Sequence, residues 1–512
     1  MTLPRRSGIL LHVTSLPGGP FSGDLGQSAY DFADFLAAAG QAWWQTLPLN
    51  PSGAQSSPYS SMSSFAGEPL LISPELLIED GLLDERLLRG VSTRSGGWRS
   101  SFARSRKLRE KLLWRAYRAF LDHGSKSRQR SFASFKRREK SWLDDYCLFG
   151  ALSDRFETRD WTRWPEDVAK RSKPALRSAR EELQLQLGYL AFQQFVFDRQ
   201  WQALRAYCRE KGIGLIGDIP MFVAHDSCDV WTHRREFLLD AKGRPKFVAG
   251  APPDAFSEDG QRWGNPVYDW AYQQRSGFTW WTERVRRQLD LFDVVRLDHF
   301  IGFSRFWRIP SKAKTAEHGR WVPARGRQLL DELVRVHGEL PFIAEDLGAV
   351  TQEVWDLRDR YGLPGMKVLQ FGFESDAGGR VHRPHDYPAQ SVAFTGTHDN
   401  DTTRGWYRAL RRRARSKDPN ARAELRRVHA YLGTEDETEV AHAAIRAVSA
   451  SPANTVIFPL QDVLNLDGKH RMNTPGTTQG NWVWRLKDGH LDASASERLR
   501  DLAMVTDRCA NR

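Results

Sequence analysis

Short apolar segments recur along this chain, and longer amphipathic stretches separate them. Eight of these segments have the length and composition of buried strands. Most neighbouring pairs enclose at least one stretch with apolar residues at helical spacing, such as 28–40, 197–212 and 325–338. This alternation favours parallel strands joined by right-handed crossovers. The eight segments are 8–13, 42–48, 213–220, 293–300, 342–348, 366–373, 391–400 and 454–462.

Eight strand–helix units predict an α/β fold, namely a closed (β/α)8 TIM barrel with largely helical inserted subdomains. An open doubly wound sheet is the alternative, but no Gly-x-Gly-x-x-Gly pattern follows an early strand to support it. The spacing between strands is uneven, so the barrel must carry insertions. Because neither an internal repeat nor a low-complexity linker divides the chain, we expect one barrel over 1–512. The insertions are expected at about 60–200 (mostly helical), 221–290 (rich in Gly, Pro and aromatic residues) and 401–453 (helical).

The formal net charge of +12 raises the possibility of a nucleic-acid-binding protein. The charge is concentrated, however. Residues 94–140 hold roughly sixteen Lys and Arg against about three acidic residues. This stretch and a second basic run at 408–427 have helical spacing, which is typical of solvated helix faces. Neither run contains an RRM, KH, helix-turn-helix or zinc-finger pattern, so nucleic-acid binding is the weaker hypothesis.

Four cysteines are scattered along the chain without a Cys-x-x-Cys pair, which predicts neither a disulfide framework nor a zinc site. Isolated thiols in a chain of this length fit a reducing cytoplasm. The apolar run near the start is too short for a secretory signal, and no apolar run is long enough to span a bilayer. We therefore expect a cytoplasmic protein without a membrane partner.

Acidic side chains stand at the ends of several predicted strands. In a barrel of this kind the C-terminal strand ends meet at one mouth, where catalytic groups lie. A lone carboxylate at a strand end would more often cap the next helix. Several carboxylates converging on one mouth indicate a functional site instead. The residues are Asp218, Asp298, Glu345, Asp346 and Asp399, accompanied by Arg296, His299 and His398.

Clustered carboxylates with histidines and aromatic residues favour glycosyl chemistry. A pair of carboxyl groups flanks the glycosidic bond in that chemistry, one as acid and the other as nucleophile or base. Aromatic rings supply flat faces for sugar rings, and the chain has 19 Trp, most of which are expected in the core. A metal site is the competing hypothesis, but no His-Glu-x-x-His or EF-hand pattern occurs. A serine hydrolase is also disfavoured, because no Gly-x-Ser-x-Gly is present.

The motifs VVRLDHFIGF (294–303), FIAEDLG (342–348) and GTHDNDT (396–402) resemble strand-end motifs of the α-amylase superfamily. More narrowly, the chain resembles the 4-α-glucanotransferases of glycoside hydrolase family 77, also called amylomaltases or disproportionating enzymes. The narrower resemblance spans nearly the whole chain. It is carried by LHVTSLPGGPFSGDLG (11–26), SSPYSSMSSFAGEPLLI (56–72), GAPPDAFSEDGQRWGNPVYDW (250–270) and RMNTPGTTQGNWVWR (471–485).

The resemblance implies a retaining transfer of a 1,4-α-D-glucan segment to the 4-hydroxyl of glucose or of a maltooligosaccharide, that is, disproportionation of maltodextrins. Asp298 would be the nucleophile that forms a glycosyl-enzyme intermediate. Glu345 would protonate the leaving oxygen and then act as base for the acceptor. Asp399 would hold hydroxyls of the transferred sugar. No cofactor and no metal are expected.

The resemblance also implies a set of substrate-binding residues. Arg296 would lie beside Asp298 and favour its charged form. Asp254, Gln261 and Trp263 match a mobile loop over the acceptor cleft in the family. The other expected binding residues are Tyr59, which would stack on the sugar, and Asp218, His299, His398 and Asn473. This chain departs from the family pattern at Glu68, Arg262 and Ile301, which bears on donor and acceptor preference and leaves the three carboxylates in place.

Transfer and hydrolysis begin with the same intermediate, so a hydrolase of the same superfamily is the closest alternative. A loop that closes over the site and excludes water favours transfer. The loop resemblance therefore favours the transferase, while spacing alone leaves the hydrolase open.

Overall fold

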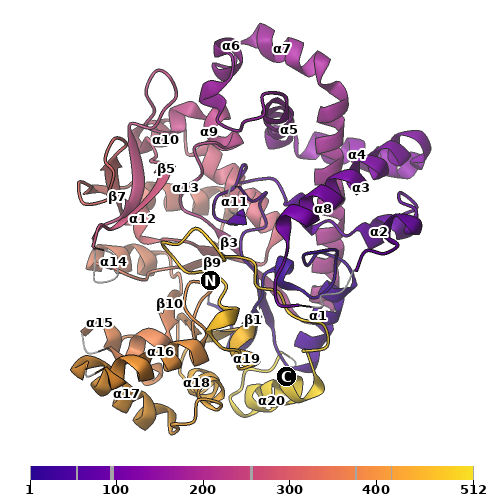
Figure 1. The fold of residues 1–512 in the computed structure, drawn as a ribbon. Coiled ribbons are helices and arrows are strands. Elements are labelled where there is room, and N and C mark those ends of the chain that lie inside the picture. Colours follow the sequence, from indigo (N-terminus) through magenta and orange to yellow (C-terminus); the bar gives the residue numbers. More distant parts are fainter. Residues whose placement is uncertain are drawn as a thin grey trace.

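Eight parallel strands close into a barrel at the centre of the structure, a computed structural model that describes residues 2–53, 56–92, 97–253, 258–374, 377–416 and 418–510. The hydrogen-bonded order is β1-β12-β11-β10-β9-β6-β3-β2, and it closes on itself (Figure 1). Every predicted strand segment overlaps one of these strands, and β1 and β10 begin before their predicted segments. The predicted barrel is confirmed. The strands are β1 (Arg6–Leu10), β2 (Trp43–Gln45), β3 (Gly214–Ile219), β6 (Val294–Leu297), β9 (Phe342–Ala344), β10 (Gly365–Val368), β11 (Ser391–Phe394) and β12 (Thr455–Pro459).

The barrel strands are apolar on both faces because side chains fill the interior and helices cover the outside. In β6, for example, Val294, Val295 and Leu297 are all buried. Gly8 of β1 shows how closely the strands pack. A Cβ atom added there would lie 2.4 Å from the Cβ of Trp43 on β2. Only a residue without a side chain permits this approach.

The connection from β2 to β3 carries a helical insertion, which occupies the right and upper parts of Figure 1. The basic stretch read from the sequence forms α3 and α4, and the amphipathic stretch 197–212 ends the long helix α8. The helices are α2 (Pro74–Glu79), α3 (Phe102–His123), α4 (Lys126–Arg138), α5 (Lys140–Arg155), α6 (Glu166–Ala169), α7 (Lys173–Glu182) and α8 (Gln184–Glu210).

A second sheet, which the sequence patterns did not indicate, lies beside the barrel. Its four strands have the antiparallel order β5-β4-β7-β8. Two strands come from the connection between β3 and β6, and two from the connection between β6 and β9. They are β4 (Phe247–Ala251), β5 (Gln261–Pro266), β7 (Arg305–Pro310) and β8 (Arg320–Pro323). The expectation that Gln261 and Trp263 lie in a loop was wrong, because both belong to β5.

The remaining helices cover the barrel and form a third insertion between β11 and β12, at the lower left of Figure 1. That insertion comprises α16 (Thr403–Arg415), α17 (Pro419–Leu432) and α18 (Val440–Ser449). The others are α1 (Gln27–Ala38), α9 (Cys228–Thr232), α10 (Trp270–Arg275), α11 (Thr279–Leu291), α12 (Ile301–Ser304), α13 (Gly326–His337), α14 (Gln352–Arg360), α15 (Ala377–Arg380), α19 (Leu460–Val463) and α20 (Ala493–Val505).

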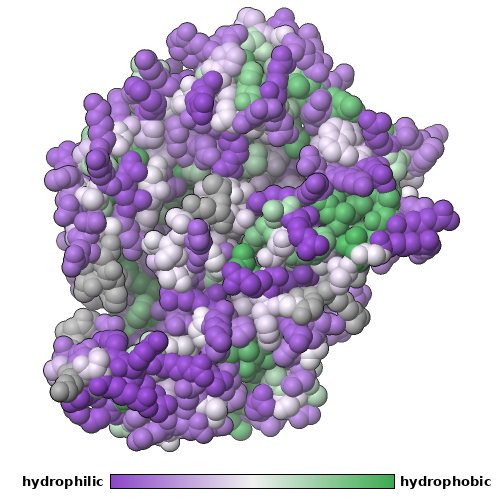
Figure 2. Space-filling view, viewed as in Figure 1, coloured by the Kyte–Doolittle hydropathy of each residue, from purple (hydrophilic) through white to green (hydrophobic). Residues whose placement is uncertain are grey.

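The two ends of the described chain meet, because Nε of Arg5 donates to the carbonyl oxygen of Thr506 at 3.1 Å. Each of the four cysteines is a free thiol. Within the described ranges, no helix combines the length and the apolar character needed to cross a membrane. The face in Figure 2 is mostly hydrophilic, and hydrophobic residues gather at its right, over α3 and α8.

Candidate active site

The C-terminal ends of neighbouring barrel strands bring the predicted residues together. Arg296 on β6 pairs in register with Asp218 on β3. Leu297 on β6 pairs with Ala344 on β9. Asp298 and Glu345 follow directly after that second pair, so these two carboxyl groups leave adjacent strands at the same level of the barrel.

Arg296 joins two of the carboxylates. Its Nη1 lies 2.9 and 2.8 Å from the two carboxylate oxygens of Asp218, and its Nη2 lies 2.9 Å from Oδ1 of Asp298. Both Arg296 and Asp218 are buried, whereas the Asp298 side chain is partly exposed toward the barrel mouth. Burial raises the pKa of Asp218 to about 7 against the opposing effect of the Arg296 guanidinium. Because the planar guanidinium is held by Asp218, its contact with Asp298 fixes the direction of the Asp298 carboxylate.

Tyr59 forms a hydrogen-bonded unit with the end of β11. Its hydroxyl donates to Oδ2 of Asp218 at 2.6 Å and lies 2.9 Å from Nε2 of His398. The Tyr59 and His398 rings stack, with centroids 5.3 Å apart and planes 14° from parallel. Because the tyrosine proton points to Asp218, Nε2 of His398 carries the proton that it donates to the tyrosine oxygen. Burial lowers the pKa of His398, which favours this neutral form.

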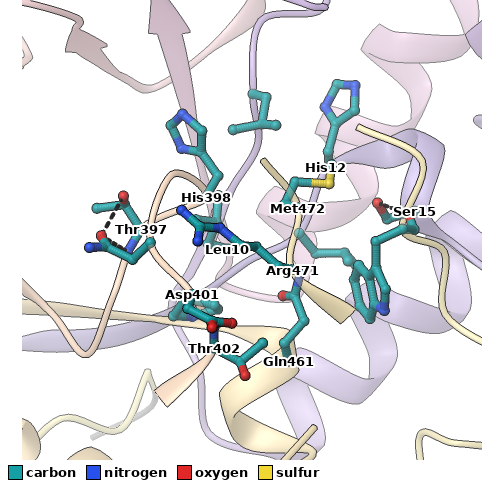
Figure 3. Close-up of a pocket in the computed structure, with 15 residues that line it drawn as sticks. Leu10, His12, Ser15, Thr397, His398, Asp401, Thr402, Gln461, Arg471 and Met472 are labelled. Carbon is teal, nitrogen blue, oxygen red and sulfur yellow. Dashed lines mark hydrogen bonds between the residues drawn. The ribbon is translucent and has the colours of Figure 1, made fainter. Parts of the chain in front are cut away.

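Asp399 is held at the mouth from two sides. Nδ2 of Asn473 donates to its Oδ1 at 2.6 Å, and Nη2 of Arg471 donates to its main-chain oxygen at 2.6 Å. Figure 3 shows the Arg471 side chain lying between His398 and Asp401. These residues line a cavity of about 20 Å³, which has room for about one water molecule. Sequence reasoning did not single out Arg471, although it is the first residue of the family-like motif 471–485.

Glu345 is held by main-chain donors. The N–H of His299 donates to Oε2 at 2.6 Å, and the N–H of Leu347 donates to Oε1 at 3.2 Å. His299 has a φ of +52°, a left-handed conformation that is uncommon for a residue other than glycine. Burial raises the pKa of Glu345 to about 8, and the charge of Asp298 adds to this rise while Arg296 opposes it. The protonated form of Glu345 is therefore favoured more than in a carboxyl group exposed to water.

Trp263 reaches the site from the second sheet. Pro266 pairs with Val248 and Arg262 with Gly250, so one residue of β4 faces three residues of β5. Such a bulge redirects a side chain, and here the Trp263 ring meets the His299 ring edge-on at 4.9 Å. Trp263 remains 39% exposed, and its Nε1 donates to Oε1 of Gln261 at 3.1 Å. Asp254, the third residue expected over the acceptor cleft, lies outside the described residues.

The described residues contain no group of three or more His, Cys, Asp or Glu side chains placed to hold a metal ion. What the site offers is a pair of carboxyl groups on adjacent strands. Arg296 binds Asp298, while burial favours the protonated form of Glu345. A carboxylate beside a carboxylic acid is the pairing that glycosidases use to cleave a glycosidic bond with retention.

Comparisons with known proteins point to the same chemistry. A family model described as 4-alpha-glucanotransferase matches residues 11–492. A 4-alpha-glucanotransferase from Thermus thermophilus is 46% identical over an alignment of 515 residues. The alignment covers 99% of this chain and 100% of the relative. A chloroplastic/amyloplastic 4-alpha-glucanotransferase from Solanum tuberosum is 41% identical, covering 98% of this chain and 86% of the relative. Among solved structures, an amylomaltase from Streptococcus agalactiae in complex with acarbose superposes with a TM-score of 0.93 at 34% identity, covering 99% of this chain and 100% of that one.

Proposed function

The chain belongs to the 4-alpha-glucanotransferase family, and we propose that Asp298 and Glu345 carry out its transfer reaction by double displacement. One observation supports this assignment above the others. Asp298 and Glu345 follow register-paired residues on adjacent strands, and their surroundings separate their roles. Arg296 binds the first carboxylate, whereas burial keeps the second protonated.

In the first step an oxygen of Asp298 attacks the anomeric carbon of the donor glucan. The bond from that carbon to the glycosidic oxygen breaks, and Glu345 gives its proton to the departing oxygen. The products are a glucan with a new free 4-hydroxyl, a glycosyl ester on Asp298 and an ionised Glu345. Proton and charge balance, because the carboxylate charge that Asp298 loses is gained by Glu345.

In the second step Glu345 acts as a base. Esterified Asp298 carries no charge, so one of the effects that raise the pKa of Glu345 is gone. The ionised Glu345 accepts the proton of the acceptor 4-hydroxyl, whose oxygen attacks the anomeric carbon and releases Asp298. A single residue thus serves as acid and then as base, because its partner changes charge between the steps.

The groups around this pair are proposed to bind the transferred sugar. Asp399 is 45% exposed and faces the mouth with one oxygen already fixed by Asn473. His299 lies beside Glu345, and His398 lies between Tyr59 and Asp399, with the Tyr59 hydroxyl bound to Asp218. The amylomaltase from Streptococcus agalactiae was solved with acarbose. We propose that the mouth of this chain takes α-1,4-glucan donors, with glucose or maltooligosaccharides as acceptors, in the cytoplasm.

The proposed roles predict the behaviour of Glu345→Gln. This variant should be nearly inactive on maltotriose, since a glutamine has no proton to give to the leaving sugar. A glucosyl fluoride needs no acid to depart, so the first step should proceed and leave an adduct on Asp298. Intact-protein and peptide mass spectrometry would locate that adduct.

Asp298→Asn is the matched control, because it should form no adduct with the same fluoride. A Glu345→Gln variant that loses activity equally on both substrates and gives no adduct contradicts the acid/base role. Product analysis of the parent protein with maltotriose alone compares the two outcomes of the shared intermediate. Glucose with longer glucans indicates transfer, whereas glucose and maltose without longer products would indicate hydrolysis.

A further inference from the structure

Phe222, just after β3, joins the barrel mouth to the second sheet. Its side chain is 6% exposed, and its ring contacts aromatic rings from four other segments. Ring-centroid distances of 5.7–6.4 Å are within the range of favourable aromatic pairs. The partners are Trp263 at 6.3 Å, Tyr268 at 5.7 Å, His299 at 6.4 Å and Phe306 at 6.3 Å. No catalytic step above uses this side chain.

Two hydrogen bonds hold the backbone immediately before Phe222. Arg284 on α11 donates to the carbonyl oxygen of Pro220, and the hydroxyl of Tyr268 donates to that of Met221, both at 2.7 Å. The Phe222 ring then stacks on Tyr268 with planes 19° from parallel. Two hydrogen bonds and a stacked ring leave Phe222 little freedom to move. It is therefore a rigid support for the aromatic rings that pack on it.

The His299 ring packs on Phe222, with the ring centroids 6.4 Å apart and the planes tilted by 43°. Within the part of the chain that the structure describes, Nε2 of His299 is buried without a hydrogen-bond partner. Packing against Phe222 and Trp263 therefore holds this side of the ring. The backbone of His299 is left-handed, and its N–H donates to Oε2 of Glu345 at 2.6 Å. A left-handed conformation persists only where the surroundings enforce it.

We propose that Phe222 is a positioning residue for the acid/base group, acting through His299. Its ring keeps His299 in the conformation that directs a main-chain N–H at Glu345. This inference rests on the role of Glu345 proposed above. Phe222 itself touches neither the reacting atoms nor Glu345, so its effect should be seen in how readily Glu345 gives up its proton.

The groups that face Glu345 set the sign of that effect. Burial raises the pKa of Glu345, and so do the charges of Asp298 and Asp346, while the Arg296 guanidinium and the N–H of His299 lower it. Loss of the His299 hydrogen bond removes a stabiliser of the ionised form and raises the pKa further. Because the first step needs protonated Glu345, the high-pH decline of kcat/KM should move to higher pH.

Phe222→Leu and Phe222→Met remove the ring while keeping an apolar side chain, and the methionine fills more of the volume if leucine folds poorly. The control is Phe237→Leu. Phe237 is 3% exposed and packs on Tyr268 at 5.3 Å and on Trp280, away from His299. The measurement is the pH dependence of kcat/KM for maltotriose, with a thermal melt of each variant.

We expect the high-pH decline to shift upward by roughly half to one pH unit in both Phe222 variants and to stay unchanged in the control. The inference is overturned if the high-pH decline of kcat/KM is unchanged in a Phe222 variant that folds. It is also overturned if Phe237→Leu shifts that decline equally. Failure of both Phe222 variants to fold also overturns it, because Phe222 would then be a core residue. Glu345→Gln separates the two proposals. If the residual activity of Glu345→Gln on the fluoride declines at high pH as the parent does, the proposed role of Glu345 is wrong. That conclusion does not depend on the result for the Phe222 variants.

Discussion

Arg471 holds two main-chain carbonyl groups beside the reaction centre. It donates through Nη2 to Asp399 and through Nε to the oxygen of Asn473 at 2.5 Å. The Asn473 side chain in turn binds the Asp399 carboxylate. One guanidinium thus fixes both members of the Asp399–Asn473 pair. A planar group with several donors in fixed directions can do this, whereas a lysine ammonium on a flexible stem cannot.

Arg471→Lys should therefore lose activity although the charge beside Asp401 is kept. Small displacements of binding groups are costly in enzymes, so we expect kcat/KM for maltotriose to fall by about 10- to 100-fold. Steady-state kinetics beside a thermal melt would measure this. If Arg471→Lys keeps parent activity while Arg471→Gln loses it, the charge matters and the direction of the donors does not.

Individual site residues differed in how visible they were in the sequence. Asp298, Glu345 and Asp399 follow short apolar strands, so the rule that catalytic groups occupy strand ends finds them. Tyr59 and Asn473 lie in loops that are distant in the sequence from the barrel strands, and only the family motifs indicated them. Arg471 and Phe222 act through contacts with segments distant in the sequence. No local pattern encodes such contacts.

At the scale of elements, strand β5 explains why part of the site was misassigned. Gly260 and Gly264 surround Trp263, and clustered glycines ordinarily indicate a loop. Both have positive φ values, of +67° and +85°, and serve a bulged strand instead. The barrel strands were predictable because each lies in a short, mainly apolar segment. The second sheet was not, because it pairs short strands from two separate connections between barrel strands.

Trp263→Ala should change the outcome of the reaction more than the stability of the fold. The ring is 39% exposed and covers one side of His299, so its removal opens the site to water. We expect free glucose to rise relative to elongated glucans from maltotriose. Trp321→Ala on β8 is the matched control, since Trp321 packs on Trp307 of the same sheet. A fall in both products together with a lower melting temperature would make Trp263 a structural residue only.

At the scale of the whole molecule, the positive charge and the active site are separate features. Much of the formal charge of +12 lies on α3 and α4 of the first insertion. The proposed catalytic residues Asp298 and Glu345 directly follow barrel strands, and the charge of Arg296 there is matched by Asp218 and Asp298. Sequence composition alone could not distinguish a basic insertion from a basic binding surface. The structure shows that the basic helices belong to an insertion and not to the barrel.

Arg508, near the C-terminal end of the described chain, binds the segment that leads into barrel strand β12. Its side chain is fully buried, and its guanidinium donates to main-chain oxygens between α18 and β12. The acceptors are Ser449 at 2.8 Å, Ser451 at 2.9 Å, Ala453 at 2.8 Å and Asn454 at 3.0 Å. This segment leads into β12, which pairs with β1 and so closes the barrel.

Arg508→Met should destabilise the protein without altering its chemistry. The apolar side chain would leave buried carbonyl groups without donors, at a cost of about 3 kcal/mol or more in the free energy of unfolding. The active site lies at the opposite, C-terminal ends of the strands, so kcat and KM at moderate temperature should stay within about twofold of the parent. Urea unfolding and the half-life of activity on heating would measure the loss. Arg5→Met is the control, because Arg5 donates to Ser451 and Ala453 from a partly exposed position and its loss should cost less. An Arg508→Met protein as stable as the parent would show that the segment leading into β12 is held without Arg508.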